Sequence, residues 1–91
     1  EAMETAVLNM WPNPNRGEQL FLTIDRLDAE VTTATVDIFD LVGKKVSSRT
    51  IAVNGTTLNT VIDLDGSLSN GIYVVNLAAG EQTFTQRLVI Q

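Results

Sequence analysis

Apolar and polar residues alternate along most of the chain, and no stretch keeps a helical period for more than two turns. The clearest alternation is at 18–25, where Leu20, Leu22 and Ile24 fall on one face. This period predicts strands in seven segments, which are 6–11, 18–25, 34–40, 44–53, 56–64, 71–78 and 84–90. Turn signals separate them roughly every 8–12 residues, so we predict an all-β fold, a seven-stranded antiparallel immunoglobulin-like β-sandwich.

Four places depart from simple alternation. Segment 71–78 is apolar on both faces, which predicts a central strand covered on both sides. Segment 44–53 changes phase, and a bulge near Ser47-Ser48 would reconcile its two halves. Gln86 is an unexplained polar residue on the apolar face of the last strand, and "DRLDAEVTT" predicts a loop or a single helical turn.

Glycine, proline and asparagine mark the turns. "PNPNRG" separates the first two strands, and Gly43 in "LVGKK" stands where a tight hairpin needs a positive φ. Asn54-Gly55 predicts a hairpin turn of type I′. Asn54 also opens an N-glycosylation pattern, Asn-Gly-Thr, but turn chemistry alone accounts for these residues.

Composition narrows the classes of function. A length of 91 residues fits one domain, with residues 1–5 as a tail from an upstream passenger or linker and 6–91 as the domain proper. The net charge of −5 and the scattered basic residues argue against nucleic-acid binding. No apolar run has the ~18 residues of a membrane helix, so we expect no membrane insertion.

Catalysis has no suitable residues. The chain has no cysteine and no histidine, so its serines have no obvious activating base, and we expect no enzyme activity and no cofactor. The paired aspartates Asp37/Asp40 and Asp63/Asp65 stand at strand ends, where aspartate favours turns. "DLDG" and "NPNRG" resemble fragments of calcium loops without the distant glutamate, so we expect turns and no metal, with calcium as the alternative.

Three longer stretches carry a resemblance when taken together. They are "WPNPNRGEQLFL" at 11–22, "VDIFDLVGKKV" at 36–46 and "LSNGIYVVNLAAGEQTFTQRLVIQ" at 68–91. In order and spacing they resemble the C-terminal sorting domain of the type IX (Por) secretion system of Bacteroidetes. Trp11 stands where tyrosine or phenylalanine is more usual, and Gln91 where a basic residue is common.

This resemblance implies a non-catalytic secretion signal on a passenger protein that lies upstream of Glu1. The passenger reaches the periplasm by a separate signal, and the domain directs it through the outer-membrane translocon with the help of shuttle proteins. A sortase-like cysteine protease then removes the domain and attaches the passenger to the cell surface. The expected location is therefore the periplasm in transit, followed by the outer membrane, the cell surface or the medium.

The resemblance also implies which residues are recognised. The translocon or receptor elements map onto Gly71, Tyr73 and the terminal Arg87, Leu88, Val89, Ile90 and Gln91. The motif turns map onto Pro12, Asn13 and Pro14 and onto Asp40, Gly43 and Lys44. A strand at the end of the chain could pair along one edge of its sheet and still present its free carboxylate and last side chains to a receptor. Backbone pairing along an exposed edge is a known way to gain affinity without a pocket.

Two alternatives stay open. The domain could be an immunoglobulin-like adhesion or carbohydrate-binding module retained on a secreted enzyme, with Trp11, Phe39 and Tyr73 as an aromatic platform. It could also be a dimerisation domain that uses its edge strands, although we expect a monomer or a weak edge-strand dimer.

Overall fold

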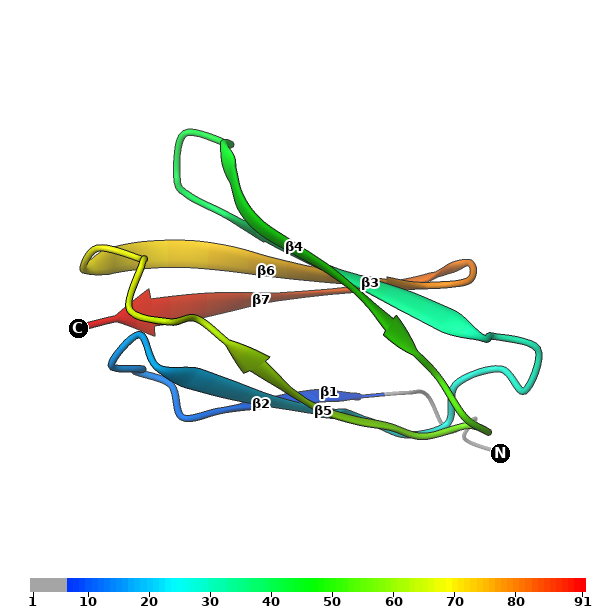
Figure 1. Cartoon of the computed structure of the whole chain (residues 1–91). Coiled ribbons are helices and arrows are strands. Elements are labelled where there is room, and N and C mark those ends of the chain that lie inside the picture. The colour runs from blue at the N-terminus through cyan, green and yellow to red at the C-terminus, as the bar shows by residue number, and fades with distance from the viewer. Residues whose placement is uncertain (1–6) are drawn as a thin grey trace, which may run out of the picture.

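The computed structural model describes residues 7–91, so the predicted tail at 1–5 lies outside the described residues. The described chain forms two antiparallel sheets that face each other, one of three strands and one of four (Figure 1). The strands are β1 Leu8–Trp11, β2 Gln19–Ile24, β3 Thr33–Phe39, β4 Lys45–Ala52, β5 Leu58–Asp63, β6 Gly71–Ala79 and β7 Gln82–Ile90. The first sheet has the order β1-β2-β5 and the second β4-β3-β6-β7. The prediction of an all-β, seven-stranded antiparallel sandwich is confirmed, and its immunoglobulin-like character stays a prediction.

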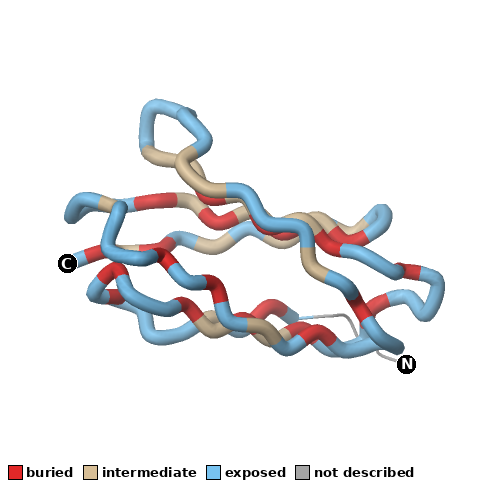
Figure 2. The backbone as a smooth tube through the Cα atoms, in the orientation of Figure 1, coloured by how far each residue is buried: buried red, intermediate tan, exposed pale blue. Residues whose placement is uncertain are grey.

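The core lies between the two sheets and consists of the alternate residues that face inward (Figure 2). In β2 the buried residues are Leu20, Leu22 and Ile24, as the alternation predicted. Val36 and Ile38 of β3 are equally buried and come from the opposite sheet. Because successive side chains of a strand point to opposite faces, one apolar residue in two is enough to fill this layer.

β6 is central in its sheet but covered on one side only. Tyr73, Val75 and Leu77 are buried, whereas Ile72 on the other face remains 40% exposed and Val74 is half-buried. The prediction of a strand covered on both sides was therefore wrong. Nothing within residues 7–91 packs over the outer face of this sheet, so the apolar residues there are left at the surface.

The irregularities of the sequence also have structural causes. Ile38 pairs with Ser47 and Phe39 with Lys45, so the bulge leaves Val46 as the extra residue, just before the predicted position. Val46 then packs against the core while Lys45 remains exposed on the other face. The segment 25–32 is a loop with a turn and has no helix, and Thr33 already belongs to β3.

The prediction of an Asn54-Gly55 type I′ hairpin was wrong. Gly55 has a φ of 75°, but Asn54 is not in the left-handed region, and Asn54 pairs with Thr57 across the turn. The two central residues are therefore Gly55 and Thr56. The turn also leads from β4 to β5, which belong to different sheets, so it changes layer instead of closing a hairpin within one sheet.

Candidate functional site

The three motif stretches meet at one end of the sandwich. Beside the 40–44 hairpin, Phe39 pairs with Lys45 on one side and with Val74, near the start of β6, on the other. Gly71, at the start of β6, pairs with Ile90 near the end of β7. The turn at 12–15 joins them through an isolated bridge between residues 15 and 90 (Figure 1). We call this part of the molecule the motif end.

The side chain of Asn13 binds the backbone of the last strand. Its Nδ2 donates to the carbonyl oxygen of Arg87 at 2.8 Å, and its Oδ1 accepts the N–H of Val89 at 3.0 Å. An amide group has one donor side and one acceptor side, so it can satisfy a strand edge as a neighbouring peptide group would. The side chain of Asn13 thus takes the place that a neighbouring strand would occupy along this part of β7.

Asn15 continues the same edge with its backbone. Its N–H donates to the carbonyl oxygen of Val89 at 2.7 Å, and its carbonyl oxygen accepts the N–H of Gln91 at 2.8 Å. Its side chain is 1% exposed and makes three hydrogen bonds: Nδ2 donates to the carbonyl oxygens of Pro12 and Gln19, and Oδ1 accepts the N–H of Gly17. Among the described residues, Asn15 is the one polar side chain in the buried class.

The outward backbone edge of β7 is therefore occupied at its end. The carbonyl oxygens of Arg87 and Val89 and the N–H groups of Val89 and Gln91 all have partners in the 12–15 turn. The expectation that this edge offers itself to a receptor strand was wrong for residues 87–91. Natural proteins commonly cover sheet edges in this way, because an unpaired edge invites association.

The side chains of the same segment divide into two sets. Leu88 and Ile90 face inward and are 0% and 2% exposed, so no partner can contact them in the folded domain. Arg87 and Gln91 are exposed, and Val89 is half-buried on the outer face. Of the five terminal residues in the predicted recognition set, three are therefore accessible.

The 40–44 hairpin is held by the carboxylate of Asp40. Its Oδ1 accepts the N–H groups of Val42 at 3.0 Å and Lys44 at 2.9 Å, and its backbone N–H donates to the carbonyl oxygen of Lys44. Gly43 has a φ of 89°, which confirms the predicted need for glycine here. Leu41 and Val42 are exposed at the tip, while Lys44 is exposed beside them.

Gly71 and Tyr73 have different environments. Gly71 is exposed at the start of β6, opposite Ile90. Tyr73 is 6% exposed, and its hydroxyl donates to the carbonyl oxygen of Ser69 at 2.7 Å. A similar hydrogen bond, from a tyrosine near the start of its strand to backbone a few residues upstream, also occurs in immunoglobulin domains. Tyr73 thus supports the fold and is not available to a ligand.

The predicted aromatic platform does not form. Tyr73 is buried, and Phe39 lies on the outer face of the four-stranded sheet, so neither joins Trp11. Trp11 instead stacks on Phe21, with ring centroids 5.7 Å apart and planes 12° apart. This pair lies on the outer face of the three-stranded sheet beside Val61, where the residues line a shallow hollow of about 280 Å³.

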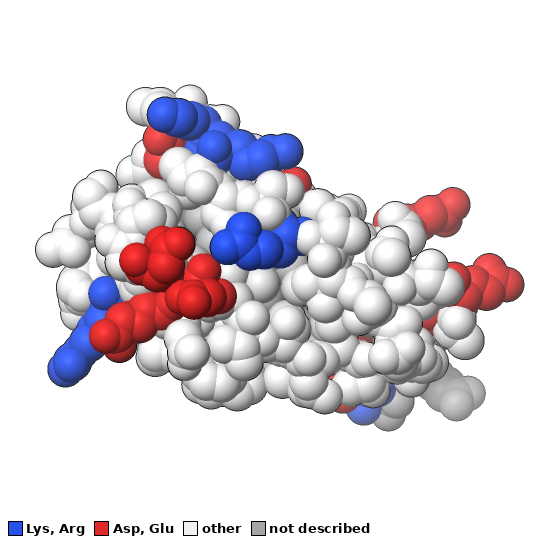
Figure 3. Space-filling model, in the orientation of Figure 1, with Lys and Arg blue, Asp and Glu red and all other residues white. Residues whose placement is uncertain are grey.

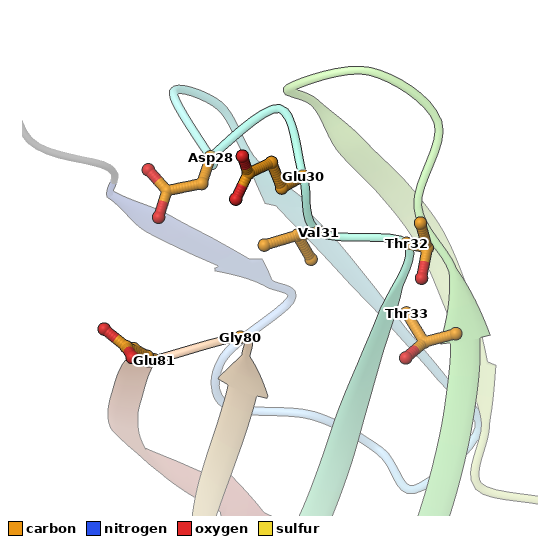
Figure 4. Close-up of a pocket in the computed structure, with 7 residues that line it drawn as sticks. All are labelled: Asp28, Glu30, Val31, Thr32, Thr33, Gly80 and Glu81. Atoms are coloured by element: carbon orange, nitrogen blue, oxygen red, sulfur yellow. The ribbon is translucent and has the colours of Figure 1, made fainter.

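Other hollows lie at the two ends of the sandwich, and one of about 270 Å³ beside Pro12, Pro14 and Phe21 has a mainly apolar lining. Another of about 440 Å³ lies at the opposite end of the sandwich, between the loop before β3 and the β6–β7 turn, and is edged by Asp28, Glu30 and Glu81 (Figure 4). On the face shown in Figure 3, acidic side chains cluster toward one end, and basic side chains lie beside this cluster and at the top of the molecule, where a few acidic atoms lie among them. Within residues 7–91, no group of three or more acidic, histidine or cysteine side chains is arranged to hold a metal ion. That part of the chain also contains no helix of the length and hydropathy needed to span a membrane.

The aspartates lie where turn chemistry predicted, with one exception. Oδ1 of Asp63 accepts the N–H of Asp65 at 2.9 Å and shapes the turn after β5. Asp37 instead points outward from β3, where it accepts the hydroxyl of Ser48 at 2.6 Å and lies 3.8 Å from Nζ of Lys45.

Sequence reasoning missed two residues that hold the first and last strands together. Asn15 was noted only as part of a turn, and Gln86 was an unexplained interruption. In the structure Nε2 of Gln86 donates to the carbonyl oxygen of Leu8 in β1 at 2.6 Å. A lone polar residue on an otherwise apolar face was the available signal, because such a residue needs a buried or half-buried partner.

The fold and the motif end define a small β-sandwich domain whose first turn fastens its last strand. The family described as the secretion system C-terminal sorting domain matches residues 9–91. The chain therefore belongs to this family, the sorting domains of type IX (Por) secretion, which is a family of signals and not of enzymes. Membership implies interaction with the secretion machinery and export to the cell surface or the medium.

Comparison with solved structures supports the fold alone. A β-glucosidase from Listeria innocua, solved in complex with isofagomine, is similar over 94% of this chain with a TM-score of 0.54 and 14% identity. The chain spans 16% of that enzyme's chain. No curated protein sequence matches the chain.

Proposed function

We propose that this domain directs a covalently attached passenger from the periplasm through the type IX outer-membrane translocon. Shuttle and translocon proteins recognise the folded domain, and a sortase-like cysteine protease then removes it and attaches the passenger to the cell surface. The observation that carries this proposal is the meeting of the family's three motif stretches at one end of the molecule. Segments far apart in sequence thus contribute to one continuous surface.

The rigidity of the motif end supports a signal that acts as a folded unit. The 12–15 turn and the 40–44 hairpin are held by side chains that satisfy backbone groups. A preformed recognition surface loses less conformational entropy when it binds than a flexible tail does.

The test is a fusion of residues 1–91 behind a periplasmic reporter in a host competent for type IX secretion. We expect the reporter at the cell surface, accessible to added protease, and an exported passenger that is lighter by about the 9.9 kDa of this chain. A reporter that stays in the periplasm, while a sorting domain native to that host exports it, would refute the transport function. An exported reporter of undiminished mass would refute cleavage but not transport.

One observation favours a second function, the retained carbohydrate-binding module. Trp11 is 45% exposed and stacks on Phe21, and Thr23 and Asn59 lie beside the hollow that the pair lines. Aromatic rings flanked by neutral polar groups suit a sugar ring, which has both apolar and hydroxyl-bearing surfaces. Calorimetric titration with soluble glycans tests this function, and saturable binding that Trp11→Ala abolishes would favour it over the transport signal.

A further inference from the structure

We infer that the outer face of the four-stranded sheet, at the motif end, is the surface by which the export machinery recognises this domain. The residues that form this outer-face patch are Phe39, Lys45, Ile72, Val74, Arg87 and Val89. The partner is a protein surface with an apolar centre and carboxylates at its rim. This inference rests on the proposed function and names the surface that performs it.

Four strands contribute one row of the patch. Lys45 of β4 pairs with Phe39 of β3, Phe39 with Val74 of β6, and Val74 with Arg87 of β7. Neighbouring strands lie about 4.8 Å apart, so the row runs across the whole sheet. Its two central members are apolar and its two outer members are cationic.

A second row extends the apolar centre. Ile72 pairs with Val89 next to Val74 and Arg87, and Ile72 is 40% exposed. Phe39, Val74 and Val89 are half-buried, so they add apolar surface without being sealed in the core. An apolar centre within a charged rim is the usual composition of a protein–protein interface, in which aromatic residues and arginine are enriched.

Charge determines the kind of partner. Arg87 forms no ion pair within residues 7–91, and Lys45 lies over the ring of Phe39, 6.0 Å from its centroid. Asp37 lies 3.8 Å from Lys45 and offsets part of its charge. The chain as a whole carries −5, so this patch is a local exception that favours a partner with carboxylates opposite the two cations.

A second copy of the chain is a poor occupant of the patch. In a two-fold dimer the same surface is used on both copies, so a cation-bounded row would face another cation-bounded row. Like charges placed opposite each other oppose such an association. An anionic polysaccharide would use the cations but gain little from the apolar centre.

The covered edge of β7 strengthens the inference. Because the 12–15 turn occupies the backbone edge at residues 87–91, and Leu88 and Ile90 are buried, recognition of this strand must use the outward side chains. Two of these, Arg87 and Val89, belong to the patch. The inference therefore explains how a largely internal strand can still be part of a signal.

The test compares two patch variants with two matched controls in the same reporter fusion. Ile72→Thr removes apolar surface from the patch, and Val61→Thr does the same on the other sheet, where Val61 is 47% exposed. Arg87→Glu reverses a patch charge, and Arg26→Glu reverses an exposed charge in the loop after β2, outside the three motif stretches. We expect each patch variant to lower surface-exposed reporter about tenfold or more, and each control to change it less than about twofold.

Thermal melting of the purified variants separates recognition from folding. All four should retain the melting temperature of the wild type within a few degrees, because surface substitutions usually change stability by about 0.5 kcal/mol or less. Should Ile72→Thr melt early, Val89→Thr replaces it. A further measurement compares how the wild type and Arg87→Glu bind to vesicles that contain anionic lipopolysaccharide. It tests whether the patch binds an anionic polysaccharide instead of a protein.

The outcomes are distinct. Normal export of folded patch variants, with an exported wild type, would overturn the inference and leave the proposed function intact. Loss of export by Arg87→Glu but not by either apolar variant, together with vesicle binding that depends on Arg87, would assign the patch to an anionic polysaccharide and also overturn it. Failure of the wild type itself to be exported would refute the proposed function.

Discussion

The amide side chain of Asn13 pairs with the backbone of Val89, 76 residues further along the chain. Its Oδ1 accepts the N–H of Val89 at 3.0 Å, while its Nδ2 donates to the carbonyl oxygen of Arg87 at 2.8 Å. Together with Asn15 and Gln86, this contact fastens the first strand and its turn along the last strand. The Pro-Asn-Pro turn therefore holds in place β7, the strand that carries the terminal motif, and we call this contact the lock.

Asn13→Ala should loosen this lock. The substitution removes two hydrogen bonds to an exposed strand edge, and we expect a loss of about 1–2 kcal/mol in the free energy of unfolding. For a domain of this size that corresponds to a fall in melting temperature of roughly 4–15 °C. Calorimetry measures it, with Asn59→Ala as the control, because Asn59 is exposed in β5 and makes no side-chain hydrogen bond within residues 7–91. Equal melting of the two variants would show that the lock contributes nothing.

Asn15→Ala should be more damaging than Asn13→Ala. Asn15 is buried, and its loss leaves the carbonyl oxygens of Pro12 and Gln19 and the N–H of Gly17 without their partner. Buried groups that lose a partner cost about 1–3 kcal/mol each when water cannot replace it. The bonds to Pro12 and Gln19 are only part-buried, so water can replace some of them, and we expect a loss of about 2–4 kcal/mol in all. Chemical denaturation gives this free energy directly. A loss smaller than that of Asn13→Ala would mean that water enters and satisfies the turn.

Sequence alternation was sufficient for the sandwich, because a two-layer core needs only one apolar residue in two on each strand. The alternation could not predict whether the outer faces of the two sheets are covered or exposed. Val74 and Ile72 have the same apolar character as buried Val75, and nothing in the local pattern says whether a further layer covers them. Composition likewise could not separate buried Tyr73 from exposed Trp11, since both aromatic residues occur in strand-like segments.

The candidate site shows the same limit. The motif residues were identifiable from the sequence, but their division into inward and outward sets depends on strand register. Asn15 was missed because an asparagine beside a proline fits an ordinary turn, whereas its role comes from contacts with Val89 and Gln91, more than 70 residues away. Such non-local hydrogen bonds have no local signature. Gln86 did have one, as a polar residue on an apolar face.

Tyr73→Phe separates a structural role from recognition at a motif position. The change removes the hydroxyl that donates to the carbonyl oxygen of Ser69 at 2.7 Å and keeps the buried ring. We expect a loss of about 1 kcal/mol in the free energy of unfolding and unchanged export of a fused reporter. Export should be measured at a temperature well below the melting point of the variant. A folded variant that fails to be exported would mean that the hydroxyl is recognised directly.

The strongest contrast is between neighbouring residues of β7. Leu88 is 0% exposed within the core, so Leu88→Ala should cost about 2–5 kcal/mol through lost burial and the cavity left behind. Val89 faces outward, and Val89→Thr keeps its β-branched shape, so we expect a change of about 0.5 kcal/mol or less. Export should respond in a different way: Leu88→Ala should recover when the cells are grown cooler, because the folded fraction rises, whereas Val89→Thr should lower export at every temperature. Measuring melting temperature and surface-exposed reporter for both variants at two growth temperatures tests this. If Val89→Thr were exported normally at both, the side chain of Val89 would have no part in recognition, and this motif position would serve the fold alone.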